Sequence, residues 1–328
     1  MSHYLGLDIG ATNLRCALAT AEGGRVGQVA HPTPQGPTVE AFTDGVETAV
    51  AAVFKETGVD PAQIAAAGIA SLGPLDVDRG VITEPANLAC DLRNIPVRTA
   101  VASCLPDVPV RLCNDAIAGI VAEYDHSNST ENLAYVTFSS GIGAGVAVDG
   151  HILRGRAGNA AEVGHVTLDP DSARRCGCGG RGHWEAFAGG ENVPAYAAEL
   201  AETEGFDDGL LTDRCTAATV FDACGDDPLA TETVDRIGDW NAQGMATLVQ
   251  MFAPQRVAVG GAVALNNERL VLDPIQERID QYLMNDPPEI ALTRFGEDIV
   301  LRGALLLAAA EGRPGLSPVS ADSKRTDL

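Results

Sequence analysis

The length, composition and charge of the chain limit what it can be. It has 328 residues, 45% of them hydrophobic, which is enough to bury a sizeable core and favours two domains. The formal net charge of −23 opposes contact with nucleic acid phosphates, so we expect no nucleic acid partner. No apolar run reaches the roughly 20 residues of a membrane span, and the N-terminus lacks the layout of a signal peptide, so we expect a cytoplasmic protein without a membrane partner.

The acidic residues are spread along the chain, and the lysines are Lys55 and Lys324 alone. Such a surface is typical of halophilic proteins from a high-salt cytoplasm, where screening makes dense like charge tolerable. Eight cysteines are too few for a disulfide scaffold in a chain of this length, and without a secretory signal we expect reduced thiols. Six of them are interpreted as small core residues: Cys16, Cys90, Cys104, Cys113, Cys215 and Cys224.

Hydrophobic periodicity predicts strands and helices that alternate along the first half of the chain. Residues 4–19 form two apolar runs joined by a polar turn, a predicted hairpin, and residues 38–58 have helical spacing that stops at Gly58. Residues 64–82 predict a strand, a Gly-Pro turn and a second short strand. Residues 108–115 predict a strand that ends on polar residues, and a helix over 116–124 follows it.

The second half repeats this alternation. Residues 132–150 predict a second hairpin, 234–254 a long helix ended by Pro254, 256–264 a buried strand with a Gly-Gly turn, and 302–310 a last helix. From Pro314 onward there is no periodicity, and we expect a disordered tail. The alternation predicts α/β layers, and the similarity of the segments at Asp8 and Ser139 predicts two halves of like architecture.

Three glycine-rich turns are candidates for phosphate binding. DIGATN at Asp8, SSGIGAG at Ser139 and VGGAVA at Gly260 present backbone N–H groups and hydroxyls without bulky side chains. None fits a P-loop, and GIGAG precedes a strand, which excludes a dinucleotide-binding fingerprint. Each turn alone is better interpreted as an ordinary turn, but the three together favour a nucleotide cleft.

Asp115 follows a predicted strand and opens a predicted helix, which places it at the edge of a sheet where open α/β folds bind ligands. A helix N-cap formed by Asn114 or Asp115 is the alternative, and it is the better interpretation of an isolated Asp. Other polar residues shift the balance toward a sugar site, because carboxylate, amide and imidazole groups suit hydroxyls that both donate and accept. These residues are Asn87, Glu162, His165 and Glu185.

The segment CGCGGRGHWE holds Cys176, Cys178, His183 and Glu185 among glycines. A disulfide between cysteines one residue apart is the weakest interpretation, because its geometry needs converging Cβ vectors. Two thiolates and an imidazole are suitable ligands for tetrahedral zinc, although a closed structural site needs a fourth. A zinc-ribbon module would need a second cysteine pair at suitable spacing, which the chain lacks.

Together these segments resemble the ROK sugar kinases. LDIGATNLR, CNDA, SSGIGAG, AEVGH, CGCGGRGHWE and VGGAV occur in the order and spacing of that family, from Leu5 to about Ala310. The resemblance implies the actin-like ATPase fold, two α/β domains of ribonuclease H type with the active site in the cleft between them. The expected domains are residues 1–113 with a returning C-terminal helix over 303–315, and residues 114–302, followed by a tail over 316–328.

The resemblance also implies roles for the residues named above. Asp115 matches the catalytic base, and the sugar ligands are expected to be Asn87, Asn114, Asp115, Glu162, His165 and Glu185. The expected nucleotide site comprises Asp8, Gly10, Ala11, Thr12 and Asn13, then Ser139, Ser140, Gly141 and Gly143, then Gly260 and Gly261. The expected cofactors are ATP, Mg²⁺ near Asp8, and a structural Zn²⁺ held by His165, Cys176, Cys178 and His183.

The chain departs from the family pattern at three places. His183 stands where a third cysteine is usual, Asn13 where a lysine often follows the threonine, and Ala161 where a glycine is usual. Histidine is a competent zinc ligand, so we expect the metal to be kept. The loss of the lysine leaves Arg15 as the basic residue nearest to the expected phosphates.

The activity implied is ATP-dependent phosphorylation of a hexose at its C6 hydroxyl, with glucose as the expected sugar. Fructose, mannose, allose or an N-acetylhexosamine are alternative substrates, because the same polar contacts serve all of them. A sugar-sensing regulator is a further alternative, although the first predicted strand starts within a few residues of Met1 and leaves no room for the DNA-binding segment of such regulators. The resemblance also suggests a homodimer or homotetramer.

Overall fold

The computed structural model describes residues 2–85, 88, 91–127 and 130–310. It divides into two compact units. Unit 1 comprises Met1–His126, Asp149–Gly158 and Val300–Leu328, and unit 2 comprises Ser127–Val148 and Asn159–Ile299. The domain limits expected at residues 113 and 303 stay a prediction.

Unit 1 is built on a five-stranded sheet with the strand order β3-β2-β1-β4-β7. Its strands are β1 (His3–Ile9), β2 (Asn13–Thr20), β3 (Arg25–Pro32), β4 (Ile64–Ser71) and β7 (Val110–Asn114). Strand β2 is antiparallel to β1 and β3, whereas β4 is parallel to β1 and β7. A small antiparallel pair, β5 (Leu75–Asp76) and β6 (Val81–Ile82), lies outside this sheet.

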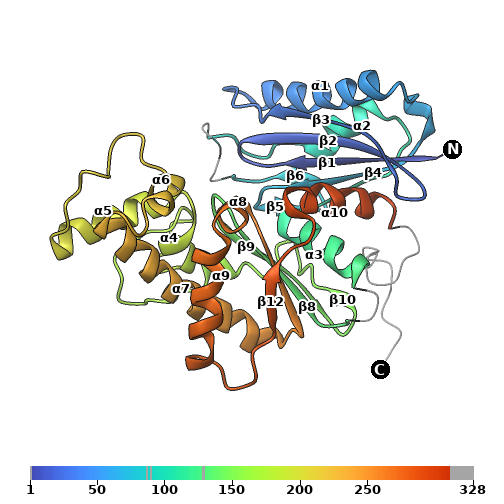
Figure 1. The fold of residues 1–328 in the computed structure, drawn as a ribbon. Helices are drawn as coiled ribbons and strands as arrows, with labels where there is room; N and C mark the ends of the chain where they lie inside the picture. The colour runs from blue at the N-terminus through green and yellow to red at the C-terminus, as the bar shows by residue number, and fades with distance from the viewer. Residues whose placement is uncertain (1, 86–87, 89–90, 128–129, 311–328) are drawn as a thin grey trace. The chain divides into compact units, whose positions relative to one another are not determined.

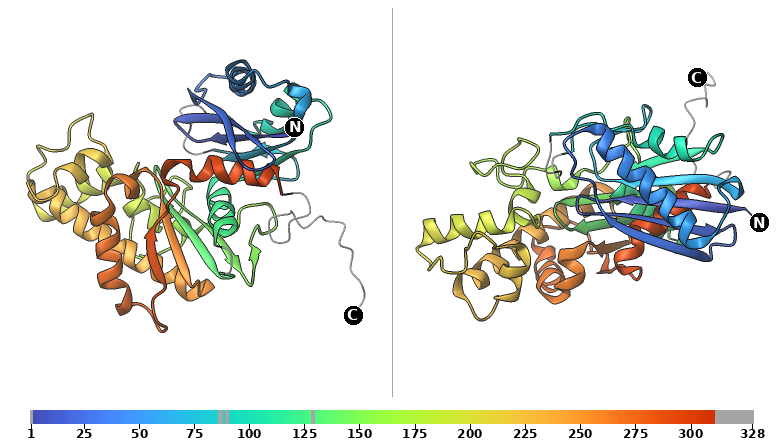
Figure 2. Two further views of the ribbon diagram at one scale, coloured as in Figure 1. Left: turned by 45° about the vertical axis from the view of Figure 1, so that its right-hand side comes forward. Right: turned by 90° about the horizontal axis from the view of Figure 1, so that it is seen from above.

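Helices cover both faces of this sheet (Figures 1 and 2). They are α1 (Val39–Thr57), the 3-10 turn η1 (Pro61–Gln63), α2 (Val97–Cys104), α3 (Asp115–His126) and α10 (Ile299–Ala308). α1 and α2 lie on one face, and α3 and α10 on the other. The core forms between these layers because strand side chains such as Leu5, Leu7 and Ile9 are fully buried.

Local sequence explains the ends of α1. The Thr38 side chain accepts a hydrogen bond from the Ala41 N–H, which satisfies a donor of the first turn. Gly58 closes the helix in the left-handed conformation, with φ 68°. Phe42, Val46, Val50 and Val53 recur at helical spacing and are buried against the sheet. The predicted helix and its stop at Gly58 are therefore confirmed.

Unit 2 contains the second five-stranded sheet, with the strand order β10-β9-β8-β11-β12. Its strands are β8 (Leu133–Phe138), β9 (Ile142–Val148), β10 (His151–Ile152), β11 (Arg256–Gly260) and β12 (Glu289–Leu292). β8 is antiparallel to β9, and β11 is parallel to β8 and β12. Each sheet thus joins an antiparallel hairpin to parallel strands, which confirms the expectation of two α/β halves of like architecture.

The other elements of unit 2 are mostly helices. They are η2 (Val163–His165), α4 (Trp184–Ala188), α5 (Val193–Glu204), α6 (Ala217–Asp222), α7 (Pro228–Phe252), α8 (Ala262–Asn266), α9 (Glu268–Arg278), η3 (Ile279–Gln281) and η4 (Gly296–Asp298). α7 and α9 lie side by side (Figure 2). α7 starts six residues before the predicted range, because Asp227 caps it and Pro228 fits its first turn. Within the part of the chain described, no helix is long and apolar enough to cross a membrane.

Candidate functional site

In unit 1 the turn between β1 and β2 is held in a defined shape. The Gly10 N–H donates to the Asn13 carbonyl at 3.0 Å. Thr33, just after β3, donates its hydroxyl to the Gly10 carbonyl at 2.7 Å and its N–H to the Thr12 carbonyl at 2.8 Å. Thr12 and Asn13 are exposed at the tip. The expected first phosphate turn is therefore a supported turn with polar residues open to solvent.

Asp8 lies at the end of β1 beside this turn and is 6% exposed. Arg15, its partner across the β1–β2 register, donates Nε to Asp8 Oδ2 at 2.9 Å. Burial raises the pKa of Asp8 above its ordinary value, and the Arg15 guanidinium opposes that rise. The charge that sequence analysis placed nearest to the expected phosphates is thus engaged by a buried carboxylate.

Asn114 and Asp115 lie where β7 ends and α3 begins. The Ala116 N–H donates to Asn114 Oδ1 and to Asp115 Oδ1, each at 2.8 Å. The capping interpretation of this pair is therefore correct, because both side chains accept a hydrogen bond from an N–H group of the first helical turn. Asp115 is half-buried. Asn87 lies outside the described residues.

In unit 2 the turn after β8 is tied to a carboxylate from α4. The Ile142 N–H donates to Glu185 Oε2 at 2.9 Å, across 43 residues of sequence. A Cβ on Gly141 would lie 2.3 Å from the same oxygen, so a side chain at this position would displace the carboxylate. Gly141 therefore makes room for Glu185, whatever else it binds.

The same turn is held from its other side by the segment after α4. The Gly190 N–H donates to the Ser139 carbonyl and the Glu191 N–H to the Ser140 carbonyl, both at 2.9 Å. Gly143 continues into β9, opposite Thr137 on β8. The expected second phosphate turn thus has a fixed backbone.

Gly260 is the last residue of β11, and Gly261 is the N-cap residue of α8. Gly261 has φ 87°, and a Cβ there would lie 2.3 Å from the Phe138 carbonyl oxygen. Only glycine fits this position, because the backbone is left-handed and crosses the end of β8 closely. The two glycines and the turn after β8 therefore meet at one edge of the unit 2 sheet.

Glu162 and His165 flank the short 3-10 turn η2. Glu162 keeps a solvent-exposed surface, yet the protein atoms crowded around it desolvate the carboxyl and raise its pKa, against the opposing effect of His165. Ala161 has φ 60°, a left-handed conformation that favours glycine. Ala161, which stands where the family usually has a glycine, therefore adopts a backbone conformation that is strained for alanine.

The cysteine segment brings four ligand atoms together in unit 2. Those of His165, Cys176, Cys178 and His183 all lie within 4.8 Å of one another. Cys176 Sγ is 3.5 Å from His165 Nδ1, and Cys178 Sγ is 3.3 Å from His183 Nδ1. Bonds of about 2.3 Å to sulfur and about 2.0 Å to nitrogen give a tetrahedron with S–N edges of about 3.5 Å. The four residues therefore fit a closed zinc site.

One residue that matters to this arrangement was missed by sequence analysis. Arg174, two positions before Cys176, donates to the carbonyl oxygens of Ala186 and Asn192 on the chain that follows Glu185. No short-range pattern indicates such a partner, because the acceptors are backbone atoms 12 and 18 residues away.

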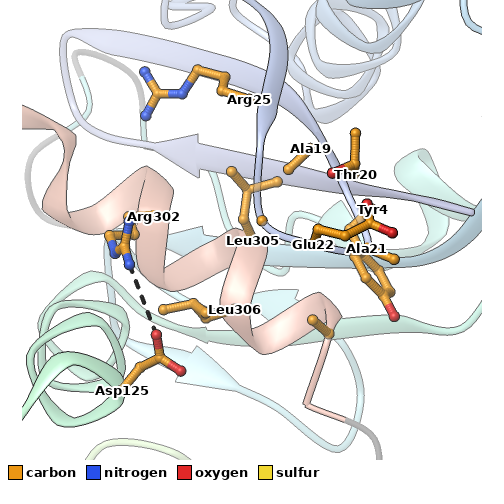
Figure 3. A pocket seen from close by; sticks show the side chains of 12 residues that line it. Tyr4, Ala19, Thr20, Ala21, Glu22, Arg25, Asp125, Arg302, Leu305 and Leu306 are labelled. Atoms are coloured by element: carbon orange, nitrogen blue, oxygen red, sulfur yellow. Dashed lines mark ion pairs between the residues drawn. The ribbon is translucent and has the colours of Figure 1, made fainter. Parts of the chain in front are cut away.

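A separate pocket of about 480 Å³ lies in unit 1, at the end of β1 away from the Gly10–Asn13 turn. Tyr4, the hairpin residues Ala19–Gly23, Asp125 of α3 and Arg302 of α10 line it (Figure 3). Arg302 and Asp125 form an ion pair at 3.8 Å. None of the residues predicted to bind sugar, nucleotide or metal lines this pocket.

Two five-stranded sheets that each join an antiparallel hairpin to parallel strands, with a His-Cys-Cys-His cluster in unit 2, define an α/β protein of two similar units with a candidate zinc site. Comparison with known proteins gives its family. The family model described as ROK family matches residues 4–311. A glucokinase from Pyrobaculum calidifontis is 35% identical over 309 residues, which is 94% of this chain and 95% of the relative. An N-acetylmannosamine kinase from Haemophilus influenzae is 31% identical over 307 residues, 92% of this chain and 93% of the relative.

The solved structure of a ROK family glucokinase from Streptomyces griseus, in complex with glucose and AMPPNP, has a TM-score of 0.77 to this chain. It is 29% identical, and the match covers 94% of this chain and 99% of that one. The chain belongs to the ROK family, and the actin-like ATPase fold that the resemblance implied is confirmed.

Proposed function

We propose that this chain is an ATP-dependent hexose kinase and that it phosphorylates glucose at the C6 hydroxyl. The observation that carries the proposal is the nearly full-length match to a glucokinase at 35% identity. The described carboxylate, amide and imidazole groups of the two units are of the kind that bind sugar hydroxyls. Kinase activity and glucose specificity are separate parts of the proposal and are tested separately below.

Asp115 is the proposed general base. Its place at the end of β7, at the first position of α3, gives the carboxylate a fixed backbone at a strand end, where α/β folds bind ligands. In the proposed reaction one carboxylate oxygen of Asp115 accepts the proton of the C6 hydroxyl. The hydroxyl oxygen attacks the γ-phosphorus, and the bond from that phosphorus to the bridging oxygen breaks as ADP leaves. Because phosphoryl transfer has a loose transition state, positioning and charge stabilisation supply most of the rate.

Glu162, His165 and Glu185 are the proposed sugar ligands of unit 2, with Asn87 and Asn114 as amide ligands of unit 1. Glu185 is held by the Ile142 N–H through one oxygen, which fixes its orientation toward a ligand. A fixed carboxylate loses less side-chain entropy on binding a hydroxyl than a free one. The bond also joins the sugar ligand Glu185 to the proposed phosphate turn.

The proposed nucleotide site comprises the three glycine-rich turns, and ATP enters as its magnesium complex. Backbone N–H groups of the turns would bind phosphate oxygens, and Asp8 would supply the carboxylate for the magnesium ion. Its ion pair with Arg15 opposes the rise in the pKa of Asp8 that burial causes.

The four residues of the cluster would hold a structural Zn²⁺, with no position left for water. The metal would cross-link the segment that runs from η2 to α4. His165 and Glu185 lie at the two ends of that segment, so the cluster fixes both proposed sugar ligands.

A specific observation favours one alternative substrate. The N-acetylmannosamine kinase at 31% identity is nearly as similar as the glucokinase, so an N-acetylhexosamine is the second candidate. A homodimer or homotetramer remains a prediction of the resemblance, and a cytoplasmic location remains a prediction from the sequence.

The test is ADP release with Mg·ATP against glucose, fructose, mannose, allose and N-acetylmannosamine. We expect kcat/KM for glucose to exceed the others. Asp115→Asn should lower kcat by about 10² to 10⁴ while sugar affinity changes little, since only the proton acceptor is lost. Asp107→Asn is the matched control, because Asp107 is exposed and asparagine tolerates its left-handed backbone.

The outcomes separate the two parts of the proposal. Turnover of N-acetylmannosamine but not glucose would keep the kinase and replace its substrate. Full activity in Asp115→Asn would remove Asp115 as the base. Sugar binding without turnover of any sugar would favour the sugar-sensing regulator instead.

A further inference from the structure

The segment between η2 and α4, residues 166–183, carries both cysteines and His183 and is here named the metal loop. Its internal shape is fixed by its own backbone bonds. The Gly182 N–H donates to the Arg174 carbonyl at 3.0 Å, and the Cys176 N–H donates to the Gly180 carbonyl at 2.9 Å. Bonds of this kind shape the loop but do not place it against the helices that follow.

The Arg174 side chain supplies such an attachment. Nε donates to the Ala186 carbonyl of α4, and Nη2 donates to the Asn192 carbonyl at 3.0 Å. Nη1 donates to the Ala195 carbonyl at 3.3 Å, on α5, and to the Glu199 carboxylate at 2.7 Å. One guanidinium thus connects the metal loop to the helix that carries Glu185 and to the next helix.

The contacts of Arg174 differ in strength because they differ in exposure to solvent. Its side chain is 8% exposed, whereas that of Glu199 is 46% exposed, so the ion pair between them is screened and contributes little. The guanidinium also lies over the Tyr196 ring, with Cζ 4.9 Å from the centroid. The carbonyl acceptors are the contacts that position α4, because a buried charged donor left without them would carry the full desolvation cost.

Arg174 lies close to both the metal cluster and the proposed sugar ligand Glu185. Two residues beyond it is Cys176 of the cluster, and the Ala186 carbonyl that it binds follows Glu185 directly. A lysine could not make these contacts together, because it lacks the planar fork of donors.

We propose that Arg174 is a positioning residue that sets the metal loop against α4, so that the cluster and the Glu185 carboxylate are held in one fixed relation. The sugar-binding part of this inference rests on the proposed function, whereas the metal-holding part does not. Loss of Arg174 leaves all four ligands and Glu185 in the chain but removes the side-chain bonds from the loop to the carbonyls of Ala186, Asn192 and Ala195.

The experiment compares Arg174→Met and Arg174→Lys with the wild type. Arg175→Met is the matched control, because Arg175 is the neighbouring arginine and is exposed, and Glu199→Gln removes only the surface ion pair. Zinc transfer from the purified protein to a colorimetric chelator measures how firmly the cluster holds the metal. Glucose affinity is read from intrinsic fluorescence, because Trp184 is the first residue of α4 and the second tryptophan, Trp240 of α7, stacks on Phe187 of α4.

We expect Arg174→Met to lose zinc about tenfold faster and to bind glucose about tenfold more weakly, as for other residues that orient metal ligands. KM for glucose should rise in proportion while KM for ATP stays near the wild-type value. Arg174→Lys should fall between, and both controls should behave as the wild type.

A lower melting temperature in Arg174→Met with unchanged zinc transfer and glucose affinity would overturn the proposal, since the residue would then only stabilise the fold. If Arg174→Met does not fold, Arg174→Lys decides by the same two measurements. If the wild type acts on no sugar, the proposed function fails. The role of Arg174 is judged separately, and equal rates of zinc transfer in the wild type and in Arg174→Met would overturn it.

Discussion

The alanine at position 161 gives a prediction whose sign can be worked out from the backbone. Ala161 has φ 60°, and its carbonyl accepts the Val163 N–H at 2.7 Å, so it begins the tight turn centred on Glu162. An L-residue in the left-handed region costs about 1–2 kcal/mol relative to glycine. Glycine in turn gives up about 0.5–1 kcal/mol of chain entropy relative to alanine.

With the midpoints of these two ranges, the net effect of Ala161→Gly is a gain in the free energy of unfolding of about 0.75 kcal/mol, or about 1–2 °C in melting temperature. Ala198→Gly is the matched control, because Ala198 is exposed in the interior of α5. There the same change should lower stability by about 0.5–1 kcal/mol, because the backbone is already helical. Ala161→Val should also destabilise, since β-branched residues avoid this region.

Thermal and urea unfolding of the four proteins, followed by circular dichroism, measure these changes. Opposite signs for the two glycine variants support the strain at position 161. If Ala161→Gly destabilises the protein as much as Ala198→Gly does, the turn is not left-handed in solution and the reasoning is wrong.

Three further predictions concern the metal, the thiols and the charge. Purified protein should contain about one zinc per chain; His183→Ala should lose most of it and His183→Cys should keep it, by metal analysis, and wild-type protein that binds no zinc would exclude the site. Burial raises the pKa of Cys113 to about 12, so its thiol stays protonated at pH 8, and iodoacetamide should modify it only after unfolding; rapid modification of the native protein would contradict this. The melting temperature should rise with KCl, because salt screens the repulsion from a net charge of −23; a constant or falling value would remove the inference of a high-salt habitat.

Much of the fold follows from signals that act over a few residues. The hairpin of β1 and β2, the end of α1 at Gly58, and the strand that ends at Asn114 were all predicted from local pattern. The capping alternative for Asn114 and Asp115 was also correct, because it needs only the next turn of helix.

The elements that were not predicted lack such signals. β3 is an edge strand with mostly exposed or half-buried residues, so it shows no clean alternation. α9 contains Pro274, which argues against a helix in sequence, and β12 has four residues. Packing against neighbours, such as α7 beside α9, decides these cases.

In the site, sequence analysis predicted the residues of the metal cluster but not what connects them. The fourth ligand, His165, came from the family resemblance and lies 11 residues before Cys176. The bond from Ile142 to Glu185 spans 43 residues, and the sequence carries no signal that the Glu185 carboxylate also needs a glycine at position 141. Such long-range contacts depend on how strands and helices pack, which a single sequence does not display.

Unit 1 combines segments that are far apart in the chain, which affects how it folds while the chain is being synthesised. α10 supplies the fully buried Leu301, Ala304 and Leu307, yet it is made after the whole of unit 2. At ordinary elongation rates a ribosome needs roughly ten to forty seconds to pass from His126 to Ala308. During that interval the nascent sheet of unit 1 has one face without its last helix, so chaperones that bind apolar surface should meet this chain there first.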